Sequence, residues 1–441
     1  MATATSSASR DMSTLRNTTS QPSSLGEHQV TFDLLKYAEM HESTRTESGR
    51  LLVTLPNFKT KELEADGTAE CLLTPWMKTM ITSTPGWAQP IIHPPSVRYD
   101  IRRAPGSRGL GMFATADIEA GALILAERPL IVKMTWFMPR VQDAHLPYEE
   151  QAANAKKFSE EQMESVYSRM SPENQKKYMS LSNSHQHDGS GPLTGISRTN
   201  GWGVDVGAQD PEVAQLGVSS GTGYSAVGEI SSRFNHSCLP NVKYTFNLQT
   251  FSMEFHAVRP IAKGEEMTVA YTSLEDRVEL RQNKLKPYGF ICTCSACKGG
   301  PLTDLQRLHA LKSVLPKTSQ GVQNADAVLA AFELTSLQSQ PRYPELLQRV
   351  AKINRKAGNR ARADELDALA AKVSTAILGR KPPEPPKPEG KGPVVWNAEE
   401  LMALIMSQTD PVKQQHIIDV LEQAAEVMQI HGQEQKSERR T

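Results

Sequence analysis

Three cysteines within six residues, Cys292, Cys294 and Cys297, constrain the fold of this 441-residue chain more than any other feature. The spacing C-x-C-x-x-C brings three thiolates within reach of one metal ion, whereas structural zinc takes four ligands in a tetrahedron. The fourth ligand must come from a distant part of the chain. The candidates by residue type are Cys71, Cys238, His236 and His256.

The cysteine count supports zinc over a disulfide. The chain has five cysteines in 441 residues, far too few for the disulfide framework of a small secreted protein. We therefore expect a zinc site in an intracellular protein, in the nucleus or the cytoplasm.

Charge and hydropathy argue against two classes of partner. The 49 basic and 49 acidic residues cancel, so the sequence predicts no overall basic field and no direct nucleic-acid binding. Because no apolar run reaches about 18 residues, it predicts no membrane-spanning helix. We expect a monomer that binds neither nucleic acid nor a membrane.

Alternating apolar residues predict short β-strands in the middle of the chain. Val242, Tyr244 and Phe246 alternate with polar residues, and Met253 and Phe255 do so after a short turn. This period of two predicts a hairpin with one buried face. Many short strands divided by turns indicate a mostly β domain, and not alternating β and α units.

Changes in composition divide the chain into seven parts. They are a disordered tail (1–28), an irregular N-terminal extension (29–95), a mostly β domain (96–286) with a helical and loop insertion (about 140–225), a cysteine segment (287–299), a helical region (300–379), a proline-rich linker (380–394) and a C-terminal helix with its tail (395–441). In the insertion, residues 151–178 are predicted to be helical and residues 185–223 to form long loops.

Apolar stripes at helical spacing predict helices near the C-terminus that pack on their neighbours. The first stripe consists of Leu302, Leu305, Leu308 and Leu311, the second of Leu366, Leu369, Val373 and Ile377, and the third of Ile417, Leu421, Ala424 and Met428.

Residues 109–114 match G-x-G-x-x-A, the dinucleotide-binding fingerprint. That fingerprint joins a strand directly to a helix within a βαβ unit. Here residues 102–108 intervene, and Gly121 follows too soon for a full helix. A nucleotide-dependent oxidoreductase is therefore the weaker interpretation. Two glycines still let the backbone approach a ligand closely, and the guanidinium of Arg108 could meet a carboxylate.

Four motifs, in this order, together resemble the SET-domain lysine methyltransferases. They are the turn Gly109-x-Gly111, the segment Arg233-Phe-Asn235-His236-Ser-Cys238-x-Pro-Asn, the segment Gly264-Glu-Glu-Met-Thr-Val-Ala-Tyr271, and Tyr288-Gly-Phe290 before the three cysteines. The pattern covers residues 97–299 and is most similar to the SET-and-MYND branch and fungal SET proteins. A MYND finger needs about eight clustered Cys or His ligands, and only Cys71 remains outside the four cysteines of the motifs, so we expect no MYND finger.

The resemblance implies a set of site residues. S-adenosyl-L-methionine would be bound by Arg108, Gly109, Leu110, Gly111, Asn200, Asn235, His236, Tyr271 and Phe290. The catalytic residues would be Tyr271, beside the transferring methyl group, and Tyr288, in the wall of the lysine channel. The structural Zn2+ ligands would be Cys238, Cys292, Cys294 and Cys297. Taken singly, Asn235 and His236 also fit a capped turn with a buried histidine, and Tyr271 fits a core residue.

The resemblance also implies a fold class and an activity. The fold would be a mostly β SET domain with short strands in small sheets, pseudoknot-like threading, a zinc-bound post-SET segment and an α-helical C-terminal region. The activity would be S-adenosylmethionine-dependent methyl transfer to the ε-amine of lysine in a protein substrate, histone or non-histone. The alternative is a catalytically inactive SET scaffold that binds peptides or serves in assembly.

Overall fold

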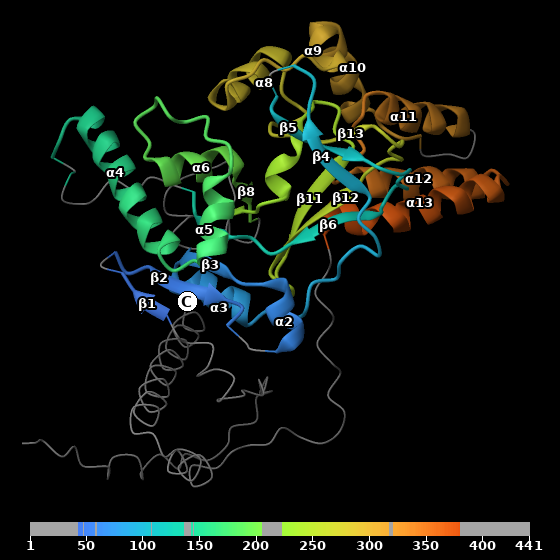
Figure 1. Ribbon diagram of the computed structural model, residues 1–441. Coiled ribbons are helices and arrows are strands. Elements are labelled where there is room, and N and C mark those ends of the chain that lie inside the picture. Colours follow the sequence, from blue (N-terminus) through green and yellow to red (C-terminus); the bar gives the residue numbers. More distant parts are fainter. Residues whose placement is uncertain are drawn as a thin grey trace, which may run out of the picture. The chain divides into compact units, whose positions relative to one another are not determined.

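A computed structural model describes residues 43–379, apart from 47, 58–59, 107, 136–142, 144, 205–222 and 317–320 (Figure 1). All of these residues belong to one compact unit, Glu39–Pro385. The expected tail (1–28), proline-rich linker (380–394) and C-terminal helix (395–441), with its stripe from Ile417 to Met428, lie outside the described residues.

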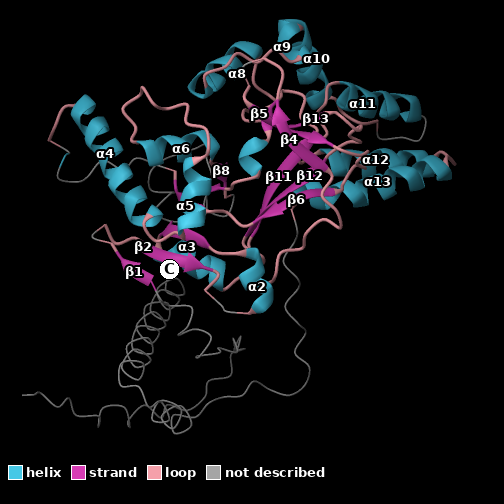
Figure 2. Cartoon of the chain, viewed as in Figure 1, coloured by secondary structure: helices cyan, strands magenta, loops and turns pink. Residues whose placement is uncertain are grey.

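Short strands form three sheets, with helices and loops around them (Figure 2). The first has the order β1 (Ser43–Arg45), β2 (Leu51–Leu55), β3 (Ala69–Leu73), β7 (Ile131–Met134), β9 (Tyr224–Val227) and β8 (Trp202–Gly203). The second has the order β10 (Asn235–His236), β13 (Glu266–Val269), β5 (Leu110–Ala114) and β4 (Tyr99–Arg103). The third has the order β11 (Val242–Asn247), β12 (Ser252–Ala257) and β6 (Leu123–Glu127). The expected class of small mixed sheets is confirmed, while the threading remains a prediction.

Residues 43–73 of the N-terminal extension contribute three strands to the first sheet, so the prediction of an irregular segment was wrong for this part. Strand β3 pairs in parallel with β7, and β2 pairs with β3. Val53, Leu55 and Leu73 of these strands are fully buried. Two short helices, α2 (Lys61–Asp66) and α3 (Pro75–Thr82), begin directly after threonine caps. Strands of three to five residues are too short to show a clear alternating pattern in the sequence.

The insertion contains more helix than the sequence predicts. The expected helical stretch forms α4 (Tyr148–Tyr167) and α5 (Pro172–Met179). A third helix, α6 (Pro192–Asn200), lies where long loops were predicted. The carboxylate of Glu160 on α4 accepts the backbone N–H groups of Leu193 and Thr194 at 2.9 and 2.8 Å. This cap comes from another helix, so the local sequence of α6 does not reveal it.

The hairpin of β11 and β12 is confirmed, with Val242 opposite Ala257. The expectation of one buried face was wrong for β12, whose residues are buried on both faces. Helix α13 (Arg360–Leu378) packs on β11 and β12 and covers the second face (Figure 1). Glu254 and His256 are consequently buried.

The C-terminal region is helical, as expected. After α8 (Val278–Leu285), η5 (Lys286–Tyr288) and α9 (Ser295–Lys298), it continues with α10 (Gly300–Lys312), α11 (Val322–Leu334), α12 (Tyr343–Lys356) and α13. On α13, Leu366, Val373 and Ile377 are buried. On α10 the leucine stripe was wrongly expected to pack on its neighbours. Residues Leu302, Leu305 and Leu308 are exposed, whereas Arg307 and Ala310 are buried.

In the part of the chain that the structure describes, no helix combines the length and the apolar character needed to cross a membrane.

Docking of α13 depends on Gly121. Its φ is +83°, and an added Cβ would lie 2.4 Å from the carbonyl oxygen of Lys372 on α13. Gly264 has a φ of +86° and no atom within 4 Å of an added Cβ. We expect Gly264→Ala to cost roughly 1–2 kcal/mol of unfolding free energy from backbone strain alone, and Gly121→Ala to cost about 1–3 kcal/mol more from the clash. Urea unfolding of both variants measures the difference, and equal costs would contradict the proposed contact.

Candidate functional site

A cleft of about 580 Å³ lies where α6, β10, the end of β13 and the segment after η5 meet. Nearly all residues expected to bind the cofactor or act in catalysis line it. They are Arg108, Gly109, Leu110, Asn200, Asn235, His236, Tyr271, Tyr288 and Phe290. Residues 339–341, between α11 and α12, also line it, so the helical region contributes to the cleft.

Glu266 joins the glycine turn to Asn235. Its carboxylate pairs with Arg108, with Nη1 and Oε2 2.9 Å apart, and accepts Nδ2–H of Asn235 at 2.9 Å. The same Nδ2 donates to the carbonyl oxygen of Leu110 at 3.2 Å. Arg108 was expected to meet a carboxylate, and in this structure that carboxylate belongs to Glu266. A charged acceptor makes these hydrogen bonds stronger than neutral ones, and they hold the turn against β10.

Gly111 lies beneath this network. A Cβ at this position would lie 2.7 Å from Nδ2 of Asn235 and 2.8 Å from Oε1 of Glu266. Gly109 has a φ of +72°, which a residue with a side chain rarely adopts. Gly109 therefore permits the turn, and Gly111 permits its close approach to Asn235.

Tyr271 follows β13, and its phenol is hydrogen-bonded within the cleft wall. Its O–H donates to the carbonyl oxygen of Phe234 at 2.6 Å. Burial raises the pKa of Tyr271 above its ordinary value, and nearby Tyr288 and Glu266 raise it further. The phenol therefore stays protonated at physiological pH. Because its proton is committed to Phe234, its oxygen can offer only lone pairs to a ligand.

Two further aromatic rings lie beside that of Tyr271, and a third lies beside one of them. The ring centroid of Tyr288 lies 4.9 Å from that of Tyr271, and the centroid of Trp202 lies 6.4 Å away in an edge-to-face arrangement. Trp202 in turn lies 5.0 Å from Tyr244. The sequence predicted Tyr288 but missed Trp202 and Tyr244. Proximity to Asn200 was the only signal for Trp202, and Tyr244 looked like any apolar strand residue.

Asn200 and Phe290 were both expected to bind the cofactor, and both line the cleft. Nδ2 of Asn200 donates to the carbonyl oxygens of Ser182 and Ile196, each at 2.8 Å. This holds the 182–184 loop against the end of α6. The ring of Phe290 lies 6.1 Å from that of His236, between centroids.

The side chain of His236 is occupied on both sides. Nδ1 lies 2.9 Å from the backbone nitrogen of Tyr271, and Nε2 lies 3.3 Å from Sγ of Cys238. Burial lowers the pKa of His236 to about 4, so the imidazole is neutral at physiological pH. The side chain thus lies between the cleft and the cysteines, and only its backbone is left for contacts with a bound cofactor.

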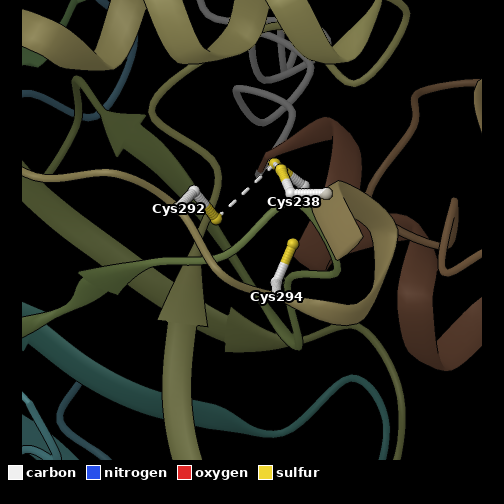
Figure 3. A group of neighbouring side chains, drawn as sticks. Cys238, Cys292 and Cys294 are labelled. Atoms are coloured by element: carbon white, nitrogen blue, oxygen red, sulfur yellow. Dashed lines mark hydrogen bonds between the residues drawn. The ribbon is translucent and has the colours of Figure 1, made fainter. Parts of the chain in front are cut away.

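The four predicted zinc ligands come together. Ligand atoms of Cys238, Cys292, Cys294 and Cys297, hereafter the four-cysteine centre, all lie within 4.8 Å of one another. Figure 3 shows the side chains of Cys238, Cys292 and Cys294 converging, with the sulfurs of Cys238 and Cys292 4.0 Å apart. Of the candidates for the fourth ligand, Cys71 is instead a buried thiol on β3. Four sulfur donors suit zinc.

Two buried arginines lie beside the four-cysteine centre, where their positive charge suits a metal site with four thiolate ligands. Nη2 of Arg281 lies 3.9 Å from Sγ of Cys297, and Nη2 of Arg307 donates to the carbonyl oxygen of Cys238 at 3.0 Å. Nε of both residues and Nη1 of Arg307 are buried without a hydrogen-bond partner among the described residues. Four thiolates around a divalent cation carry two excess negative charges. Nη1 of Arg281 also pairs with Asp304 at 2.8 Å, and the two guanidinium groups would offset part of the negative charge of the centre.

The arginines were not predictable from the sequence. Both lie on helices, α8 and α10, where a charged residue usually faces solvent.

Residues 109–272 match the SET domain family. The chain is 30% identical to histone-lysine N-methyltransferase set5 of Schizosaccharomyces pombe over 207 residues, which cover 46% of this chain and 52% of that protein. It is 40% identical over 75 residues to a SET and MYND domain-containing protein of Dictyostelium discoideum, covering 17% of this chain and 19% of that protein. The chain thus spans about half the length of the first relative and less of the second. The expected resemblance is confirmed.

Among solved structures, the SET domain of LSMT bound to lysine and AdoHcy matches with a TM-score of 0.21 and 13% identity, over 68% of this chain and 91% of that chain. A TM-score this low establishes no shared architecture by itself.

Loss of one sulfur should empty the four-cysteine centre. Because binding at a structural zinc site contributes folding free energy, we expect Cys292→Ser to lower both the zinc content and the melting temperature. Cys71→Ser is the matched control, since its thiol is buried but lies outside the centre and donates to the carbonyl oxygen of Ala69. Elemental analysis and thermal unfolding measure the two effects. Equal zinc in both variants would reject the assignment of the ligands.

Proposed function

We propose that this chain, whose residues 109–272 form a SET domain, transfers a methyl group from S-adenosyl-L-methionine to the ε-amine of lysine in a protein substrate. The proposal rests on the cleft and on relatives that are named histone-lysine N-methyltransferases. The observation that carries it is the arrangement around Tyr271, a half-buried, protonated phenol in the wall of a cleft that other aromatic rings also line.

The glycine turn and β10 offer the groups that would hold the cofactor. Arg108, Gly109, Leu110, Asn200, Asn235 and Phe290 line one continuous cleft with Tyr271, and Gly111 lies beneath it. Bound S-adenosylmethionine would supply an electrophilic methyl group on a sulfonium. Phe290 would pack on its adenine. His236 would contribute backbone contacts, because both of its ring nitrogens have other partners.

Oxygens at the centre of the cleft would favour the transfer. The proton of the Tyr271 phenol is committed to the carbonyl of Phe234, so the phenolic oxygen can accept weak CH···O contacts from an electropositive methyl group. The raised pKa of Tyr271 makes it a poor base at physiological pH. Its role would therefore be to align and stabilise, and not to remove a proton.

The aromatic rings would prepare the lysine. Tyr288 and Trp202 lie beside the ring of Tyr271, Tyr244 lies beside Trp202, and all of them line the cleft. An ammonium group that enters such a channel loses its water, and desolvation lowers the pKa of a lysine. The neutral amine is the nucleophile that methyl transfer needs. Alignment of the two reactants in a fixed geometry would supply most of the acceleration.

Zn2+ at the four-cysteine centre would have a structural role. With four protein sulfurs as ligands, the ion has no open position for a substrate or water. Its proposed task is to hold the segment of Tyr288 and Phe290 against β10.

The substrate would be a histone or another protein in the nucleus or the cytoplasm. The chain would act as a monomer, without binding nucleic acid directly.

Tyr271→Phe tests the activity. We expect this change to lower kcat with a lysine-bearing protein substrate on the order of 10²-fold, as small losses of alignment do, while the fold persists. Tyr178→Phe is the matched control, because Tyr178 is also a buried phenol that donates to a backbone carbonyl, that of Leu193, but lies outside the cleft. Transfer of radiolabelled methyl to cell extract measures both variants.

Calorimetry with S-adenosylmethionine separates the enzyme from the inactive scaffold. We expect heat of binding for wild type and for Tyr271→Phe alike. Absence of binding to the wild type, or absence of methyl transfer by the wild type, would favour the scaffold. Equal methyl transfer by the two phenylalanine variants would reject the role assigned to Tyr271.

A further inference from the structure

We propose that His236 is a positioning residue that couples the four-cysteine centre to Tyr271. The inference rests on the proposed methyl transfer, because that reaction gives the position of Tyr271 its importance. It adds that the metal would act on the cleft through one imidazole ring, as well as by stabilising the fold.

The geometry at His236 determines where its ring proton lies. The backbone N–H of Tyr271 can only donate, so Nδ1 of His236, 2.9 Å away, must accept. Nδ1 therefore has no proton, and the single N–H of the ring is on Nε2. Nε2 lies 3.3 Å from Sγ of Cys238, so the N–H points at the sulfur.

The sulfur must therefore act as the acceptor. If the Cys238 thiol donated to Nε2, the ring would have two accepting nitrogens and no proton. A metal-bound thiolate is a much better acceptor than a thiol, because it carries negative charge. The hydrogen bond from His236 is thus the arrangement expected when the four-cysteine centre holds its cation, and it corresponds to the outer hydrogen bonds that orient metal ligands.

Tyr271 is held at two points by one short segment. Its backbone N–H is bonded to His236, and its phenol donates to the carbonyl of Phe234, two residues earlier. The ring of His236 also packs 5.3 Å from the ring of Tyr271, between centroids. A rotation of the imidazole would therefore release the backbone of Tyr271 and shift its phenol.

Burial leaves the Nε2–H group of His236 little access to water as another hydrogen-bond acceptor. His236 is 4% exposed and Cys238 is fully buried. Sγ of Cys238 is therefore the acceptor on which the Nε2–H group depends in a place with little access to water, and a change at the four-cysteine centre that moves this sulfur would disfavour the present ring orientation. The position of the sulfur is thereby linked to the hydrogen bond at Tyr271.

Two substitutions at His236 separate the two hydrogen bonds. In His236→Asn the side-chain amide stands near the position of Nδ1, where it can accept from Tyr271 but cannot reach Cys238. In His236→Gln the amide stands near the position of Nε2, where it can donate to Cys238 but leaves the N–H of Tyr271 without its acceptor. If His236 only filled space, the two variants would give the same result at both ends.

Two spectroscopic measurements on the full-length protein report separately on the hydrogen bond at Cys238 and on the one at the backbone N–H of Tyr271. Cobalt(II) in place of zinc gives a thiolate-to-metal charge-transfer band that responds to hydrogen bonding at the sulfur. For the other end, ¹⁵N-tyrosine labelling of the zinc protein gives one amide signal for each of the ten tyrosines, and the signal that Tyr271→Phe removes belongs to Tyr271.

We expect the readouts to respond in opposite ways. His236→Asn should shift the cobalt band and leave the Tyr271 amide near its wild-type position. His236→Gln should leave the band and move the amide, and its kcat should fall at least about 10-fold below that of His236→Asn, with the KM for S-adenosylmethionine changed less than about 3-fold. In the wild type, cadmium in place of zinc should move the Tyr271 amide but not that of Tyr178.

An unchanged cobalt band in His236→Asn, or an unmoved Tyr271 amide in His236→Gln, would overturn the coupling. If either variant fails to fold, the zinc-to-cadmium exchange in the wild type decides, and a stationary Tyr271 amide rejects the proposal. The spectra do not depend on turnover. An inactive protein with the expected spectra would therefore contradict the proposed function while leaving the hydrogen-bond relay in place.

Discussion

Parallel pairing of two very short strands, β10 and β13, is the constraint on which the site depends. Asn235 lies opposite Thr268 and His236 opposite Val269, and the pairing continues to the backbone N–H of Ser237. The other edge of β13 pairs with β5, which brings the glycine turn alongside. A single four-residue strand therefore joins β10 and β5, and the hydrogen bonds that link Glu266, Asn235, His236 and Tyr271 depend on this register.

The hydrogen bonds at this junction connect partly buried groups around Glu266 and Tyr271 to the buried imidazole of His236. Glu266 is paired with Arg108 and Asn235, the phenol of Tyr271 with Phe234, and the imidazole of His236 with Tyr271 and Cys238. In a low dielectric, satisfied polar groups hold one another in a single arrangement. A cleft built in this way is organised before a ligand arrives, which is how positioning and electrostatics contribute to catalysis.

The sequence predicted those parts of the structure that short-range chemistry specifies. The cysteine spacing indicated a metal site, the alternating residues around Tyr244 indicated the hairpin, and the stripe that includes Val373 indicated α13. The sequence predictions that were wrong concern which side chains are buried. The leucines of α10 look like a core stripe, yet the helix buries Arg307, which donates to the carbonyl oxygen of Cys238. Trp202 has no motif of its own, and it joins the cleft because β8 pairs with β9.

The sequence by itself determined which residue types are available: four cysteines for a metal, a glycine turn, and a tyrosine after a strand. Each of these depends on neighbours along the chain or on the chemistry of single residues. Only the tertiary structure decided that His236 lies between Cys238 and Tyr271, that Glu266 joins Arg108 to Asn235, and that two arginines are buried beside the sulfurs. Such contacts depend on strand register and helix packing, and no local pattern in the chain encodes either.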